Sequence, residues 1–287
     1  AGSGISVTNG SGSITIANTA TVAAATPTAL GTVYGLTASA TIPTFLGYEA
    51  GLGNTGNQTT AVGYQALRSS NSGQFNTALG WTALYANTSG SSNVALGPQT
   101  LKANTTGASN IAIGSAALTA NTTADNNVAI GQQALTTNTT GAYNTGVGSY
   151  ALTANTTASN NTAVGFQALD ANTTGGDNTA VGSNALGANT SGQNNISIGS
   201  DSLKTNTTGN YNNAMGTQAL QNNTTGGSNV AIGTSTLLSN TTGGLNTGVG
   251  NSALFANTTG ANNTAVGNSA LNVNTTASNN TAVGYES

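Results

Sequence analysis

The sequence contains no cysteine and no histidine, and it carries only three Lys or Arg and six Asp or Glu among 287 residues. Without Cys or His, the usual zinc and haem ligand sets, a thiol nucleophile and a Ser-His-Asp triad are all excluded. Six scattered acids are too few for a ladder of calcium sites. Three cations cannot neutralise a phosphate backbone, so we expect no nucleic-acid binding. The composition therefore predicts a protein that is not an enzyme and that holds no metal or cofactor.

Long apolar runs are also missing, so the sequence predicts no membrane span. The lack of Cys rules out a disulfide framework, yet it is compatible with an extracellular protein built from many repeats. The chain opens at Ala1 with neither an initiator Met nor a signal-peptide pattern. We therefore expect a processed chain or a segment of a longer one.

What the sequence has in abundance is Gly, Asn and Thr, arranged in a seventeen-residue repeat. A Gly that follows an aliphatic residue marks each repeat, and we number the repeat from this Gly as position 0. An offset copy, Gly47, precedes the first regular one by one residue less than a full repeat. Disordered sequence has no reason to hold such a phase, whereas stacked coils must hold it. The regular copies are Gly63, Gly80, Gly97, Gly114, Gly131, Gly148, Gly165, Gly182, Gly199, Gly216, Gly233, Gly250, Gly267 and Gly284.

Positions −3 to −1 alternate between larger and small residues, which predicts a short strand. Position −1 is aliphatic, position −3 is mostly β-branched, and position −2 is small. We expect positions −1 and −3 to face the core together and position −2 to face another closely packed surface. Position +4 is Leu in all thirteen complete repeats, beginning with Leu67, Leu84 and Leu101, and it is expected to complete the core.

Asn occupies position +7 in twelve of thirteen repeats, with Ser70 as the exception. Thr follows at +8 and Gly or Ala stands at +10, a pattern that predicts a turn. A second Asn stands at −4. We expect these Asn residues, beginning at +7 with Asn87, Asn104 and Asn121, to bond backbone groups or their copies on adjacent coils. The same Asn-Thr-Thr strings match the glycosylation pattern, but glycans about 4.8 Å apart would be crowded, so the turn is preferred.

These features predict an all-β fold, a parallel β-solenoid with one coil per seventeen-residue repeat over positions 47–287. Each coil is expected to contain a strand, a bend at Gly, a second short strand with the Leu, and the Asn turn. Fourteen coils would extend roughly 65 Å. Residues 1–46 are expected to form a separate β connector or cap, with a hairpin around Asn9-Gly10-Ser11-Gly12. The sequence stops in mid-repeat, so the native chain is expected to continue beyond Ser287, because a finished solenoid normally protects its last edge.

Large aromatic and charged residues gather at positions +1, +2, +5 and +12, which we expect to be exposed. The candidate surface contacts are Tyr64, Trp81, Tyr85 and Phe166. Three interpretations remain open: ordinary variation at a solvent-facing surface, aromatic platforms for a glycan or receptor, and an interface between chains.

The string Asn161-Thr-Ala-Val-Gly-Phe-Gln-Ala-Leu169, together with Asn-Thr-Thr-Gly, resembles the repeat regions of bacteriophage tail-fibre and tail-spike-like proteins. The Asn-x-Ala-Val/Ile-Gly core is also similar to the head repeats of trimeric autotransporter adhesins, which form a left-handed parallel β-roll with a shorter repeat. Residues 31–37 resemble the segment that leads into such repeats in phage fibres. The resemblance implies a homotrimer on a virion or cell surface, associated with other virion or appendage proteins and outside the cell.

The first functional hypothesis is therefore a structural and adhesive shaft of a phage fibre or surface appendage, serving host attachment or spacing. A bacterial cell-surface adhesin belongs to the same class. The alternative is an ice-binding solenoid, with a row of Thr at position +8 formed by Thr88, Thr105, Thr122 and their equivalents.

An enzyme, such as a glycan depolymerase, is a third hypothesis. Such hydrolases generally need two carboxylates at a defined separation. Asp170 and Asp177 are the only close acid pair, and they stand at +5 and +12, on different parts of one coil. Two solvated surface acids are the preferred interpretation.

Overall fold

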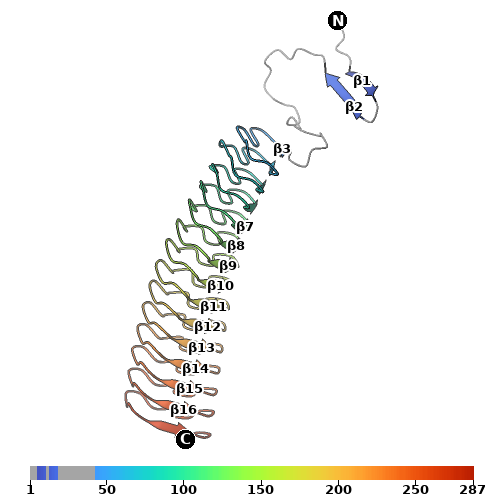
Figure 1. Cartoon of the computed structure of the whole chain (residues 1–287). Helices are drawn as coiled ribbons and strands as arrows, with labels where there is room; N and C mark the ends of the chain where they lie inside the picture. Colours follow the sequence, from blue (N-terminus) through green and yellow to red (C-terminus); the bar gives the residue numbers. More distant parts are fainter. Residues whose placement is uncertain (1–4, 11–12, 19–42) are drawn as a thin grey trace. The chain divides into compact units, whose positions relative to one another are not determined.

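The computed structural model describes residues 5–10, 13–18 and 43–287, and all regular secondary structure within them is β-strand (Figure 1). By its contacts the chain divides into two units, residues 1–31 and 32–287. In the first unit, β1 (Ile5–Gly10) and β2 (Ser13–Asn18) pair antiparallel, with Gly10 opposite Ser13, as the hairpin prediction requires. The predicted lead-in at residues 31–37 lies outside the described residues.

In the second unit, fifteen short strands stack in chain order into one parallel sheet, with one strand in each coil (Figure 1). Neighbouring strands pair residue for residue, as Thr162 with Thr179 and Val164 with Val181. This architecture confirms the predicted all-β parallel solenoid with one coil per seventeen-residue repeat. The strands are β3 (Thr44–Leu46), β4 (Thr60–Val62), β5 (Thr77–Leu79), β6 (Val94–Leu96), β7 (Ile111–Ile113), β8 (Val128–Ile130), β9 (Thr145–Val147), β10 (Thr162–Val164), β11 (Thr179–Val181), β12 (Ile196–Ile198), β13 (Asn213–Met215), β14 (Val230–Ile232), β15 (Thr247–Val249), β16 (Thr264–Val266) and β17 (Thr281–Val283).

The chain turns sharply at position 0, where only glycine fits. Gly165 has a φ of 141°, a conformation that side chains disfavour. A Cβ atom on Gly165 would also lie 2.4 Å from the carbonyl oxygen of Gly182 in the next coil. Both the backbone angle and the contact between coils therefore explain why the Gly recurs without exception.

The second short strand that we predicted after this Gly is absent from the coil. Positions +2 and +4 instead adopt left-handed conformations, with φ of 52° at Gln167 and 54° at Leu169. The backbone N–H groups at these two positions point in opposite directions along the solenoid. Gln167 N–H donates to Ser149 O (3.1 Å) in the preceding coil, and Leu169 N–H donates to Ala185 O (3.0 Å) in the next. The segment satisfies its backbone groups between coils without extended geometry.

The core is formed by Leu at +4 and small residues at −2 and +3. Leu169, Ala163 and Ala168 have no exposed surface. The predicted inward Leu row is therefore present, but the predicted strand orientation is wrong: position −2 faces inward and the aliphatic position −1 faces outward. Exposed fractions of 37–49 % are found at the outward residues Leu79, Ile130, Val164, Ile198, Met215, Ile232 and Val266.

A thin coil explains this orientation. A Cβ atom at Gly146, in position −2, would lie 3.4 Å from Ala151 O and 3.5 Å from the Leu135 side chain. An Ala methyl fills the space beneath the strand, and a larger side chain would have to displace the opposite wall of the coil. The surface that packs closely against position −2 thus belongs to the same chain and not to a partner.

Two rows of buried Asn run along the solenoid. At position +7, the Asn155 side-chain amide donates to Asn138 Oδ1 (2.8 Å) and to Ala158 O (3.0 Å), and Asn155 Oδ1 accepts from Asn172 Nδ2 (2.9 Å). At position −4, Asn161 Oδ1 accepts from the backbone N–H of Asn178 (3.0 Å). The predicted bonding of Asn to backbone groups and to its axial copies is confirmed.

The one apparent gap in the +7 row is filled by the next residue. Asn71, which follows Ser70, donates to Asn54 Oδ1 (2.8 Å) and accepts from Asn87 Nδ2 (2.7 Å). The second coil therefore has one residue more before its Asn and one fewer after it. Its total length is unchanged, and the row of amides continues without interruption.

Candidate functional site

The first coils of the solenoid carry an aromatic row on their outer surface at position +1. Tyr48, Tyr64 and Trp81 are 51 %, 47 % and 49 % exposed. The backbone places them on consecutive coils, because Gln65 N–H donates to Tyr48 O (2.8 Å) and Thr82 N–H donates to Tyr64 O (2.9 Å). The rings of Tyr48 and Tyr64 are stacked, with centroids 5.3 Å apart and planes 14° from parallel. This row is the largest exposed aromatic array on consecutive described coils.

A hydrogen-bonded ionic cluster lies beside this row. Glu49 Oε2 accepts from Gln65 Nε2 (2.8 Å) and from Arg68 Nε (2.6 Å). Arg68 Nη1 also donates to the Tyr85 hydroxyl (3.0 Å), and its guanidinium carbon lies 5.7 Å from the centre of the Tyr85 ring. The cluster spans three coils and fixes the orientation of four polar side chains.

Electrostatics within the cluster follow from these contacts. Hydrogen bonds from Arg68, then from Gln65, lower the pKa of the Glu49 carboxyl. The Glu49 carboxylate in turn raises the pKa of both Arg68, through the hydrogen bond, and Tyr48, through its charge. At neutral pH the site holds one carboxylate and one guanidinium, and these two charges cancel.

Thr82 distinguishes these coils from the rest. It follows Trp81 at position +2, with a φ of 53°, and it is the only β-branched residue with positive φ in the part of the chain that the structure describes. Its Oγ1 is also the one buried side-chain polar atom there without a hydrogen-bond partner. Left-handed geometry and an unpaired buried hydroxyl both cost free energy, so this position is locally strained.

The structure brings three of the four predicted surface residues together. Tyr64 and Trp81 belong to the aromatic row, and Tyr85 is bonded to Arg68. Phe166 lies on a distant coil, 49 % exposed, where it makes an edge-to-face contact with Tyr150 at 6.1 Å. Sequence reasoning did not assign Tyr48, Glu49 or Gln65 to the site, although Gly47 marks their offset repeat and gives Tyr48 the same position +1 as Tyr64.

The predicted structural residues lie inside the coils. Leu67, Leu84 and Leu101 are fully buried, as are Asn87, Asn104 and Asn121. Asn104 donates its side-chain amide to Asn87 Oδ1 (2.7 Å) and to Gly107 O (2.9 Å), so the folded coil leaves this nitrogen no room for a glycan. Gly63, Gly80 and Gly97 occupy the sharp bend with φ between 131° and 142°.

The Thr row at position +8 lies on the Asn turn and not on the strand. Each hydroxyl donates to the carbonyl oxygen of the next Thr in the row, as Thr88 Oγ1 does to Thr105 O (3.0 Å) and Thr105 Oγ1 to Thr122 O (3.0 Å). The hydroxyl hydrogens are therefore committed to the neighbouring coils. The row therefore presents hydroxyl oxygens that can still accept a hydrogen bond, without free hydroxyl donors.

The two acids considered for catalysis have different surroundings. Asp170 is partly buried, and this burial raises the pKa of its carboxyl, whereas Asp177 is exposed at position +12, after the Asn turn. Within the residues that the structure covers, no three His, Cys, Asp or Glu side chains group together to hold a metal ion.

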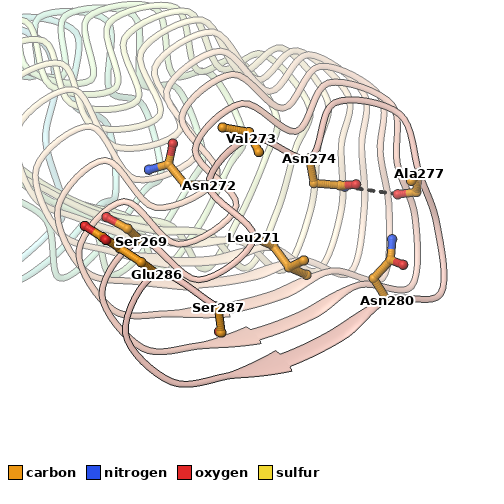
Figure 2. Close-up of a pocket in the computed structure, with 9 residues that line it drawn as sticks. All are labelled: Ser269, Leu271, Asn272, Val273, Asn274, Ala277, Asn280, Glu286 and Ser287. Atoms are coloured by element: carbon orange, nitrogen blue, oxygen red, sulfur yellow. Dashed lines mark hydrogen bonds between the residues drawn. The ribbon is translucent and has the colours of Figure 1, made fainter.

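The last coil carries a hollow of about 690 Å³, shown in Figure 2. It is lined mainly by polar side chains around Leu271, and an Asn274–Ala277 hydrogen bond (3.0 Å) closes one side. The hollow exposes the end of the Leu and Asn rows, where no further coil covers them. Its lining includes Ser269, Ser287 and a single acid, Glu286, and it belongs to the core cross-section of the last coil.

The described residues contain no helix with the length and apolar character needed to cross a membrane. Comparisons with protein-family models, with curated proteins and with solved structures found no match for this chain.

Proposed function

We propose that the protein is the structural and adhesive shaft of a fibre, either a phage fibre or a cell-surface appendage, located outside the cell. One observation carries this proposal: an aliphatic face runs along the outer side of the sheet from the first coil to the last. The resemblance of the repeat to fibre and adhesin repeats supports the same class of function.

The outward face is wider than the strands alone. Position −1 supplies an unbroken row of Val, Ile, Leu and Met, and position −3 supplies a second row of Thr, Val and Ile with Asn213 as the exception. At position +12 most coils carry Ser or Asn, and four coils add a large apolar side chain. These four side chains are 55–63 % exposed, namely Phe75, Tyr143, Tyr211 and Leu245. An exposed aliphatic row that runs along the whole sheet is typical of an interaction surface.

A second copy of the chain is the partner that fits this face. The face repeats at every coil, so a parallel copy in register would meet it at every coil. The row is about 65 Å long, so an in-register copy would contact it over the full length of the sheet. The resemblance favours three copies, and we therefore propose a parallel homotrimer with the sheet faces turned toward one another.

Assembly would also serve adhesion. Three chains in register would present each surface feature three times, which raises avidity for a cell-surface glycan or receptor. The core of one coil is thin, and burial of the outward aliphatic residues between chains would add to the stability of the rod.

Light scattering on the full chain tests the assembly. The expected mass is three times the 27.7 kDa of one chain. Ile130→Asp with Ile198→Asp places two charges on the aliphatic face and should give the monomer mass. Thr174→Asp, at an exposed position on the Asn turn, is the matched control and should leave the mass unchanged. A wild-type chain that is monomeric at micromolar concentration would contradict the proposal.

A further inference from the structure

The aromatic row and the ionic cluster of the first coils form one surface, which we call the aromatic–ionic site: Tyr48, Glu49, Tyr64, Gln65, Arg68, Trp81 and Tyr85. We propose that this site binds a neutral saccharide, and this inference rests on the proposed adhesive function because it names the ligand class of the shaft.

The side-chain chemistry matches a sugar. Pyranose rings have apolar C–H faces that pack on aromatic side chains, and hydroxyl groups that need both donors and acceptors. Tyr64 turns one face toward Tyr48, so the half-exposed Trp81 ring and the exposed parts of the Tyr48–Tyr64 stack supply the apolar contact. Arg68 gives two of its five N–H groups to Glu49 and Tyr85 and is 36 % exposed, so it has further donors for a hydroxyl group.

The polar groups are fixed before a ligand arrives. Glu49 is held by both Gln65 and Arg68, and Arg68 is held by Tyr85. Few but well-oriented polar groups beside apolar surface are the usual composition of a small-ligand site. Pre-organisation reduces the entropy lost on binding, which matters for a weakly binding ligand such as a sugar.

Charge selects a neutral ligand. The Glu49 carboxylate and the Arg68 guanidinium form a salt bridge and cancel, and the whole chain carries a net charge of −3. A polyanion would find no excess of cations here, and a polycation would compete with Arg68 for one carboxylate. Hydrogen bonding and ring packing, the interactions of a neutral saccharide, are what the site offers.

The axial arrangement fits a linear oligosaccharide. Consecutive aromatic residues repeat with the coil spacing of ~4.8 Å, comparable with the length of one pyranose unit. A chain of sugars lying along the rod would meet the exposed parts of the Tyr48–Tyr64 stack and then Trp81. Beyond them the row continues with Pro98 and then with small or polar residues up to Phe166, which limits the site to the first coils.

The strain at Thr82 is a second structural observation at this place. Its buried, unpaired hydroxyl and its left-handed backbone occur directly after Trp81 in the same coil. Strained residues concentrate at binding sites, where surrounding structure holds them.

Trp81 provides the test, because it is the only tryptophan of the chain. The full-length chain is titrated with cellohexaose, maltohexaose and the hexamer of N-acetylglucosamine, with a hyaluronan oligosaccharide as the anionic probe, and tryptophan fluorescence is followed. A saturable change with at least one neutral hexamer is expected. Tyr64→Ala and Arg68→Gln should each weaken that binding by about tenfold or more, as removal of a central contact does.

Phe166→Ala, which removes an aromatic residue from the same repeat position on a distant coil, is the matched control and should leave the affinity unchanged. Thermal unfolding checks that each variant is folded. Absence of a saturable change with every neutral hexamer, binding of hyaluronan alone, or equal loss in Phe166→Ala would overturn the inference. The light-scattering mass is measured separately, so a trimer without saccharide binding would refute this site and leave the proposed shaft intact.

Discussion

The inward and outward positions of the coil obey different rules, although they alternate along the same few residues. Inward positions hold one residue type along nearly the whole solenoid: Asn at −4, a small residue at −2, Leu at +4 and Asn at +7. Outward positions such as +1 and +5 range from Ser to Trp and from Gly to Arg. An inward side chain packs against its own copies above and below, so a change in one coil disturbs three. An outward side chain has no such constraint and is free to carry function.

Removal of an inward Leu should give the largest effect. Leu169→Ala leaves a cavity beneath β10 and should lower the free energy of unfolding by about 2–5 kcal/mol. Val164→Ala shortens a side chain on the outer side of the strand. In the monomeric Ile130→Asp/Ile198→Asp background it should cost about 1 kcal/mol or less. Denaturant unfolding of both variants measures the difference. Equal losses of unfolding free energy in the two variants would contradict the assignment of an inner and an outer side to the coil.

Neighbouring Asn residues offer a sharper comparison of the same kind. Asn223 is buried, donates to Asn206 Oδ1 (2.8 Å) and Gly226 O (2.9 Å), and accepts from Asn240 (2.8 Å). Asn223→Ala should destabilise by about 1–3 kcal/mol, because it leaves buried groups of two coils unpaired.

The adjacent Asn222 is exposed and stands at a position where most repeats have Ala. Asn222→Ala should change the free energy of unfolding by less than about 0.5 kcal/mol. Loss of stability in Asn222→Ala comparable to that in Asn223→Ala would mean that the amide row does not hold the turn.

At Thr82 a substitution should increase stability. Gln is the residue at the equivalent position of the coils before and after, Gln65 and Gln99, and both have positive φ. Thr82→Gln removes a β-branched side chain from left-handed geometry and eliminates the unpaired hydroxyl, so a gain of about 1 kcal/mol is expected. The change in thermal midpoint measures it, and a decrease would show that the Thr82 methyl group is needed for packing beneath Trp81.

The smallest expected effect is that of pH. The chain has no His, so stability should be nearly constant from pH 6 to 8. The folded-state pKa of Glu49 lies below its ordinary value of 4.5, so its contribution is present above that value and is lost as the pH falls through the folded-state pKa. Asp170 has the opposite sign: its folded-state pKa lies above 3.8, so protonation in acid relieves a cost of folding.

Thermal midpoints of the wild type and Glu49→Gln between pH 7 and pH 3 separate these contributions. The wild type should lose more stability in acid than Glu49→Gln does. Identical acid profiles would indicate that the Arg68–Glu49 pair contributes nothing to folding.

The repeat interval, the strand position and the turn were predictable because each leaves a periodic mark on the sequence. Strand orientation was not, because alternation separates two faces without saying which one is inside. The aliphatic residues at −1 favoured an inward orientation for that position, which is wrong. The orientation is decided by the narrow space beneath the strand, which accepts Ala163 next to Leu169 but no larger side chain. That space is known only from the structure. The left-handed residues at +2 and +4 were also hidden, because Gln and Leu are not residues that usually signal that conformation.

The aromatic–ionic site was predictable in part. Tyr64, Trp81 and Tyr85 stood out as large residues in variable positions. Glu49 and Arg68 are 19 residues apart in the sequence. Glu49 is at position +2 of the first coil, which is shorter than the others, and Arg68 is at position +5 of the next coil. Sequence spacing alone could not show that these two charges meet.

Cysteine labelling distinguishes the inner from the outer side of the strand most directly, because the natural chain has no cysteine. Single Ala163→Cys and Val164→Cys variants are made in the monomeric Ile130→Asp/Ile198→Asp background and treated with a maleimide. Ala163→Cys should react about a hundredfold more slowly than the unfolded chain, since it reacts only when the coil opens, and Val164→Cys should react at nearly the unfolded rate. Fast labelling at position 163 together with protection at position 164 would contradict the inward orientation of Ala163 and, with it, the outward aliphatic face on which the proposed shaft depends.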